Sequence, residues 1–239
     1  MLEGRIISMP HSPRVAPCLA SWQKVLDSVT VFPAVVGKHI ECNDPRISTD
    51  LYKRLITTRF NPLQFNTDYM TNKAQIGCAL SHIALWNECV HKNRPLVIIE
   101  DDTVVQSTRK ELDIQIRRST LTCLIYWYLS NEAHSGKVSE IRDTFYGTQA
   151  YYIEPPAAKL LLRHAFPLSL HIDRYMAYVA ARFETTWKCA YPRLQFKTVG
   201  QSTLSHEQVA KGSSFSAMLI VLVLLVYFIT RATLPRCRK

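Results

Sequence analysis

Glycine is scarce in this chain, with 7 among 239 residues, and no glycine-rich phosphate-binding motif occurs. Neither G-x-G-x-x-G nor the G-x-x-x-x-G-K-[ST] pattern is present. Both motifs depend on glycine because the backbone must approach a phosphate closely. Their absence removes the usual sequence support for dinucleotide-dependent redox chemistry and for P-loop nucleotide hydrolysis. A bound phosphate must therefore be held in another way.

Closely spaced cysteine pairs are also absent. The seven cysteines form no C-x-x-C pair, and their number is odd, which argues against a zinc site and against a disulfide framework. We expect reduced thiols that are mostly buried, and the alternative is one or two disulfides. The seven positions are Cys18, Cys42, Cys78, Cys89, Cys123, Cys189 and Cys237.

A concentrated basic surface is not evident either, although the formal net charge is +10. Four of these charges belong to the last nine residues, and no basic run is interleaved with aromatic residues. The charge therefore favours a diphosphate-bearing substrate or acidic lipid headgroups over a nucleic acid partner. Because 47% of the residues are hydrophobic and only 20% are charged, a disordered chain is excluded.

The C-terminal region contains the longest apolar run. Residues 212–230 carry no charge and are followed by a basic tail at 231–239. About 20 apolar residues cross a hydrocarbon core, so we expect a single-pass C-terminal membrane anchor after a catalytic domain at 1–210. The alternative is a buried helix. The N-terminus has no apolar signal region. The positive-inside rule places the basic tail in the cytoplasm and the domain on the other side of the membrane. We favour the opposite orientation, with a cytoplasmic domain, because a short tail crosses a membrane more easily than a folded domain does.

Apolar runs and helical periodicity alternate before residue 210. We expect strands at 4–8, 30–37, 96–99, 123–130 and 148–154, and helices at 74–91 and from Pro155 onward. Asn72 and Gln75 resemble a capping box for the first helix. This alternation predicts an α/β fold with a mostly parallel sheet.

Three consecutive acids, Glu100, Asp101 and Asp102, follow the apolar strand at 96–99. Ligands of open α/β sheets bind at the carboxyl ends of the strands. On an extended backbone, Glu100 and Asp102 would project to the same side and share a hard cation such as Mn²⁺ or Mg²⁺. The alternative is an acidic cap for the following helix.

Several segments in this order resemble glycosyltransferase family 25, which includes bacterial lipooligosaccharide glycosyltransferases and collagen galactosyltransferases. The segments are Gly77, Ser81 and His82 in a Gly-x-x-x-Ser-His pattern, the acids at 100–102, Gly147, Thr148, Ala150 and Tyr151, and Asp173. They cover most of residues 5–205. The resemblance implies a GT-A-like, Rossmann-related domain that transfers a hexose from a nucleotide sugar with inversion.

The resemblance also implies roles for individual residues. Glu100 and Asp102 are expected to bind Mn²⁺ or Mg²⁺, and Asp173 and Asp101 are expected to be catalytic. The nucleotide-sugar contacts are assigned to Arg14, Gly77, Ser81, His82, Gly147 and Thr148. The expected donor is UDP-galactose or UDP-glucose, and the acceptor is a glycan, lipid-linked or protein hydroxyl.

Some positions have competing interpretations. The first strand ends in Ser8-Met9 where the family commonly has Asn-Leu, so the alternative function is an inactive, membrane-tethered binding or assembly protein. His82 is either a core histidine or a site residue, and His171 or His206 is a further candidate metal ligand. Asp173 is either catalytic or the partner of Arg174 in a surface ion pair. Tyr151 and Tyr152 are expected in the core rather than stacked on a sugar.

Overall fold

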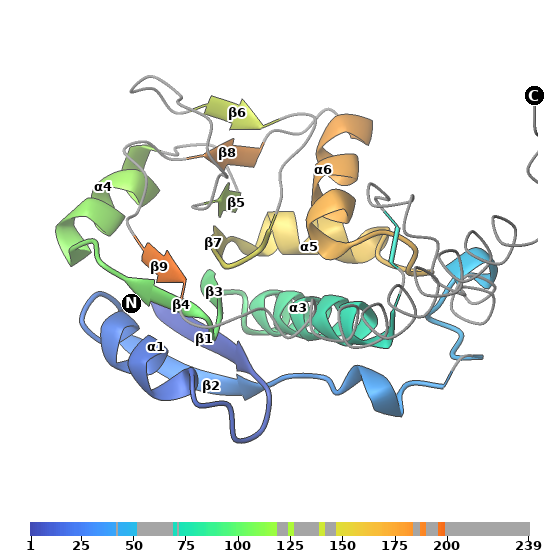
Figure 1. Ribbon diagram of the computed structural model, residues 1–239. Coiled ribbons are helices and arrows are strands. Elements are labelled where there is room, and N and C mark those ends of the chain that lie inside the picture. The colour runs from blue at the N-terminus through green and yellow to red at the C-terminus, as the bar shows by residue number, and fades with distance from the viewer. Residues whose placement is uncertain are drawn as a thin grey trace, which may run out of the picture. The chain divides into compact units, whose positions relative to one another are not determined.

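The computed structural model of the protein describes residues 1–41, 43–51, 69–70, 72–118, 124–126, 139–141, 147–183, 187–189 and 196–198 (Figure 1). Residues 1–200 form one compact unit. No helix within the described ranges is both long and apolar enough to cross a membrane. The membrane anchor expected at 212–230, the basic tail and His206 all lie outside these ranges.

A seven-stranded sheet forms the centre of this unit, with the strand order β2-β1-β3-β7-β5-β8-β6. The strands are β1 (Glu3–Ser8), β2 (Ser28–Pro33), β3 (Leu96–Glu100), β5 (Leu124–Tyr126), β6 (Ser139–Ile141), β7 (Ala150–Ile153) and β8 (Trp187–Cys189). Strands β2, β1 and β3 pair in parallel, β7 is antiparallel to both of its neighbours, and β6 is antiparallel to β8. Five of these seven strands therefore point the same way, which confirms an α/β fold with a mostly parallel sheet.

Helices cover both faces of the sheet (Figure 1). They are α1 (Val15–Trp22), α3 (Lys73–Lys92), α4 (Arg109–Arg118), α5 (Pro155–Arg163) and α6 (Ile172–Arg182), with a short 3₁₀ helix η1 at Gly37–His39. A two-stranded sheet pairs β4 (Thr103–Val105) with β9 (Phe196–Thr198).

Alternate residues of the central strands enter two separate hydrophobic cores. Ile98 of β3 and Tyr151 of β7 pack with α3, α5 and α6, whereas Val97 and Ile99 pack with α1 and α4. Successive strand side chains point to opposite faces, so an uninterrupted apolar run is needed when both faces are covered. The four apolar residues of β3 are indeed all buried, as their sequence predicts.

The long helix α3 begins and ends as its sequence predicts. Asn72 accepts a hydrogen bond from the backbone N–H of Gln75, and the Gln75 side chain accepts one from the backbone N–H of Asn72. This reciprocal capping box satisfies two amides that have no partner within the helix. Asn93 ends the helix in the left-handed conformation, with φ of 48°. The helix predicted from Pro155 is confirmed as α5.

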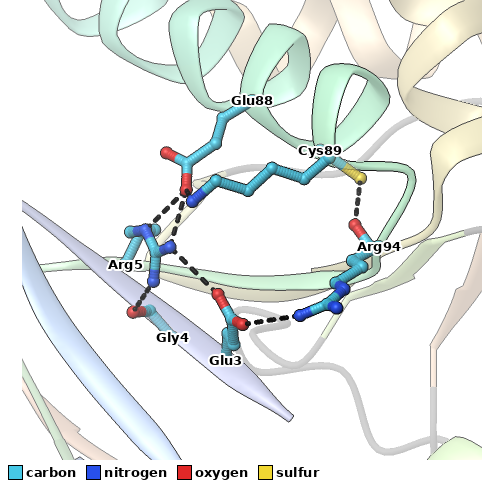
Figure 2. Close-up of polar contacts among 7 residues, drawn as sticks. Glu3, Gly4, Arg5, Glu88, Cys89 and Arg94 are labelled. Atoms are coloured by element: carbon cyan, nitrogen blue, oxygen red, sulfur yellow. Dashed lines mark hydrogen bonds and ion pairs between the residues drawn. The ribbon is translucent and has the colours of Figure 1, made fainter. Parts of the chain in front are cut away.

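A network of charged residues fastens α3 to the amino end of β1 (Figure 2). Arg5 is only 8% exposed, and its Nε donates to Glu88 Oε1 at 2.8 Å. Its Nη2 also lies 3.0 Å from Glu3 Oε2, and Lys92 Nζ donates to Glu88 at 2.8 Å. A buried guanidinium is stable only when its charge and donors are satisfied, so this network fixes the helix against the strand.

One local prediction was wrong. The sequence was interpreted as an extended backbone through Glu100 and Asp102, but β3 ends at Glu100, and Asp101 and Asp102 form a turn that leads into β4. The Thr103 hydroxyl donates to the carbonyl oxygen of Glu100 at 2.8 Å, which stabilises this turn. The three acids therefore do not alternate along one extended strand.

Candidate active site at the carboxyl edge of the sheet

Asp101 lies beside the end of β1, and each of its carboxylate oxygens contacts a neighbouring side chain. Its Oδ1 lies 2.7 Å from Arg14 Nη2, and its Oδ2 accepts a hydrogen bond from the Ser8 hydroxyl at 2.6 Å. The structure therefore gives Asp101 and Arg14 the geometry of positioning residues, which join the end of β1 to the turn after β3.

Glu100 lies at the junction of β3, β7 and α3. Its Oε1 accepts a hydrogen bond from the Thr148 hydroxyl at 2.6 Å and lies 3.6 Å from His82 Nε2. Burial opposes ionisation of this carboxyl. The neighbouring imidazole and the Thr148 hydroxyl, together with the charge of Arg14, outweigh burial and hold the pKa of Glu100 below its ordinary value. Glu100 is therefore a carboxylate at neutral pH.

A chain of buried side chains orients His82. The Trp86 indole N–H donates to the Tyr151 hydroxyl oxygen at 2.9 Å, and His82 Nδ1 lies 2.8 Å from the same oxygen. An indole nitrogen can only donate, so the tyrosine hydroxyl accepts from Trp86 and has its own proton to give to Nδ1. In neutral His82 the ring proton is then on Nε2, which faces Glu100. The expectation that Tyr151 belongs to the core is confirmed, and Tyr152 is buried as well.

Asp102 is the acid whose environment is least favourable to its charge. It is 8% exposed, and its Oδ1 is buried with no hydrogen-bond partner among the described residues. Burial and the nearby Glu100 carboxylate raise the pKa of Asp102 to about 7, although Arg14 acts in the opposite direction. A divalent cation fits here, because it would satisfy the unpartnered oxygen and compensate the repulsion between two carboxylates.

Asp173 approaches from α6 and holds the segment that precedes β7. Its Oδ2 accepts from the backbone N–H of Gly147 at 2.7 Å, and its Oδ1 accepts from the backbone N–H of Arg174 at 2.8 Å. Gly147 has a φ of 83°, a conformation that favours glycine. Asp173 therefore contacts a site segment rather than lying alone on the surface, and each oxygen retains a second lone pair.

Gly77 and Ser81 support the site from behind. A Cβ atom on Gly77 would lie 2.4 Å from the carbonyl oxygen of Val35, so only glycine permits this approach of α3 to the loop after β2. The Ser81 hydroxyl accepts from the backbone N–H of Val35 at 2.9 Å and donates to the carbonyl of Gly77 at 2.7 Å. Ser81 is completely buried, and its hydroxyl joins α3 to the loop after β2.

Cys78 lies near Glu100, Asp102 and Asp173. The sequence did not predict this position for Cys78. Desolvation of the half-buried Cys78 thiol, together with the charges of Glu100, Asp173 and Asp102, raises its pKa well above the ordinary value. Two of these acids follow β3 and the third belongs to α6, so two separate stretches of the chain converge on one region. The spacing of Cys78 and His82, four residues apart on a predicted helix, was the available signal, since such residues share a helix face.

A comparison with known protein families gives a match along most of the chain. Residues 1–176 match the family described as glycosyltransferase family 25 (LPS biosynthesis protein). No curated protein matches the sequence. The solved structures matched include UTP-bound UGPase from Acinetobacter baumannii, with 9% identity and a TM-score of 0.44 over 92% of this chain and 99% of that chain. They also include apo UDP-glucose pyrophosphorylase, with 11% identity and a TM-score of 0.44 over 91% of this chain and 100% of that chain. A197 from STIV has 9% identity and a TM-score of 0.42 over 84% and 96%.

Proposed function

Because the chain belongs to glycosyltransferase family 25, and is therefore a glycosyltransferase, we propose that it transfers galactose or glucose from a UDP-sugar to a hydroxyl acceptor with inversion at the anomeric carbon. The acceptor class is a glycan, lipid-linked or protein hydroxyl, and the family description favours a glycan of lipopolysaccharide type. The proposal includes a GT-A-like arrangement of the domain and a C-terminal membrane anchor formed by residues 212–230.

One observation supports this proposal above all others: Asp173 of α6 lies near the two acids Glu100 and Asp102 at the carboxyl edge of the sheet. Glu100, Asp102 and Asp173 all act on the Cys78 thiol. Ligands of open α/β sheets bind at this edge. A concentration of negative charge there suits a site that binds a cation together with a diphosphate.

Each acid has a distinct proposed role. Asp102 and Glu100 would hold Mn²⁺ or Mg²⁺, a cation that neutralises the charge developing on a departing diphosphate. The Thr148 hydroxyl and His82 keep Glu100 ionised and oriented. Asp173 is the proposed base, because its remaining lone pairs are available to accept the proton of the acceptor hydroxyl. Gly147, which Asp173 positions, would line the donor site.

A donor screen tests this proposal. The complete chain is incubated with individual UDP-sugars and Mn²⁺, and released UDP and glycosylated products are quantified by mass spectrometry. We expect one UDP-hexose to be consumed, and Asp102→Asn to lower turnover by roughly 10²-fold or more, which is about the contribution of one electrostatic catalytic contact.

The matched control is Asp113→Asn in α4, a half-buried aspartate that pairs with Arg109 in the described structure. This variant should retain the turnover of the unmodified chain. Equal turnover of Asp102→Asn and Asp113→Asn would exclude the cation role of Asp102. Failure to consume any UDP-sugar would exclude the proposed donor class.

A further inference from the structure

Three side chains of different chemical type meet where α3 approaches the end of β3. A Cys78 sulfur, a His82 ring nitrogen and a Glu100 carboxylate oxygen all lie within 4.8 Å of one another. Cys78 and His82 are one turn apart on α3, and Glu100 is the last residue of β3. A rigid helix and a buried strand therefore present the three donor atoms to a common point.

One member of this group, His82, has a ring nitrogen in the interior without a hydrogen-bond partner among the described residues. His82 is 0% exposed, and its Nε2 has no hydrogen-bond partner among the described residues. It lies 3.6 Å from Glu100 Oε1, which is beyond normal hydrogen-bond distance. Buried polar atoms nearly always have a partner, so the position of Nε2 points to a ligand between the imidazole and the carboxylate.

The second ring nitrogen is supported in the manner of a metal-binding histidine. Nδ1 lies 2.8 Å from the Tyr151 hydroxyl, which Trp86 orients in turn. Histidines that bind metals with one nitrogen are commonly fixed by a hydrogen bond at the other nitrogen. A metal on Nε2 would require the other tautomer, in which Nδ1 carries the ring proton and donates to the tyrosine oxygen while the hydroxyl proton turns away from Nδ1.

We propose that Cys78, His82 and Glu100 form a binding site for a thiophilic divalent cation of the zinc class. Sulfur, imidazole and carboxylate ligands together suit zinc and its chemical relatives, whereas Mn²⁺ and Mg²⁺ prefer oxygen. Three protein ligands leave one position of a tetrahedral ion open. The site is formed without a C-x-x-C pair, through one helical turn and a strand end.

This site shares Glu100 with the cation proposed for sugar transfer but does not require that reaction. Asp102 belongs only to the proposed transfer site, and Cys78 belongs only to the new one. Replacing each separately distinguishes the two proposals. If the chain does not bind a zinc-class cation, the proposal of sugar transfer still stands. If the chain does not transfer sugar, the proposal of a zinc-class site still stands.

Cadmium is a suitable probe, because a cadmium–thiolate bond produces an ultraviolet charge-transfer absorption that oxygen ligands do not give. Cd²⁺ is titrated into the complete, reduced chain. We expect a thiolate absorption that saturates at one equivalent, is lost in Cys78→Ser and persists in Asp102→Asn. The affinity should fall more than about tenfold in Cys78→Ser and in His82→Gln.

Cys89→Ser is the matched control, since Cys89 is a buried thiol on the same helix that donates to the carbonyl of Arg94. It should retain the absorption. An unchanged absorption in folded Cys78→Ser, or no thiolate absorption in the unmodified chain, would overturn the proposal.

A second measurement avoids dependence on the folding of the variants. Cys78 in the unmodified chain is alkylated with iodoacetamide, with and without saturating Cd²⁺, and its peptide is quantified by mass spectrometry. The proposal requires that Cd²⁺ slow alkylation of Cys78. An identical rate under both conditions would refute it.

Discussion

Replacing Asp102 with asparagine should stabilise the metal-free protein while weakening its cation binding. The Asp102 carboxyl has a pKa of about 7 in the folded protein and an ordinary value of 3.8. The unfolded chain therefore releases this proton at a lower pH than the folded chain does. Stability falls as the pH rises from about 4 to about 7 and is then constant, with a total loss of roughly 4 kcal/mol. Asparagine has no such proton to lose.

Urea unfolding in the presence of EDTA measures this effect. At about pH 8, Asp102→Asn should be more stable than the unmodified chain by up to roughly 4 kcal/mol, and near pH 4 the two should be nearly equal. Asp44→Asn is the control, because the pKa of Asp44 is shifted in the opposite direction. Hydrogen bonds from Arg46 lower the pKa of Asp44 to about 2, so its replacement should not stabilise the protein at pH 8. If the difference for Asp102→Asn were the same at both pH values, the reasoning from burial of its charge would be refuted.

Cation binding should show the complementary dependence. A proton and Mn²⁺ compete for Asp102, so below about pH 7 the affinity for Mn²⁺ should fall by about tenfold for each pH unit. Calorimetric titration at several pH values tests this expectation. Asp102→Asn should bind Mn²⁺ more weakly and without that pH dependence. A variant with the same affinity and the same pH profile would show that Asp102 is not a ligand.

The remaining predictions concern residues that position the site, and all are measured by urea unfolding. Gly77→Ala should destabilise the protein by about 2–3 kcal/mol because its methyl group would overlap a backbone carbonyl; a change below about 0.5 kcal/mol would contradict this packing. Arg14→Gln should destabilise the protein by about 3–5 kcal/mol because it leaves the buried Asp101 charge unpaired. Arg46→Gln breaks an exposed ion pair and should destabilise it by less than about 1 kcal/mol. Equal losses of stability would refute the distinction between the buried pair and the exposed pair. Tyr151→Phe should cost about 2 kcal/mol, since an indole and an imidazole lose their partner; a neutral result would mean that the two rings find other partners.

The sequence predicted those elements whose stabilising signals are local. The capping box of Asn72 and Gln75 lies within four residues, and the apolar run of β3 directly reflects burial on both faces. The Pro155 start of α5 is a similar short-range signal. Strand direction has no such signal, because apolar periodicity is the same for either direction, and β7 therefore could not be recognised as antiparallel.

The candidate site was predicted in its residue types but only partly in its contacts. Glu100 and Asp102 were found because acids after a buried strand are chemically conspicuous. The pairing of Asp101 with Arg14 connects residues 87 positions apart and depends on how α1 packs, so it needed the structure. Cys78 was overlooked because a single cysteine in a helix usually belongs to the core.

The reversed direction of β7 determines which parts of the chain can be altered to change specificity. Since β7 is antiparallel to β3, Gly147 and Thr148 enter the sheet at the edge where β3 ends. A parallel strand of four residues would place them about 13 Å away, at the opposite edge. Substitution of Thr148 would thus change the immediate surroundings of Glu100 without changing the residues of β3 or β7. The start of β7 therefore offers protein engineers a point of access to the acids.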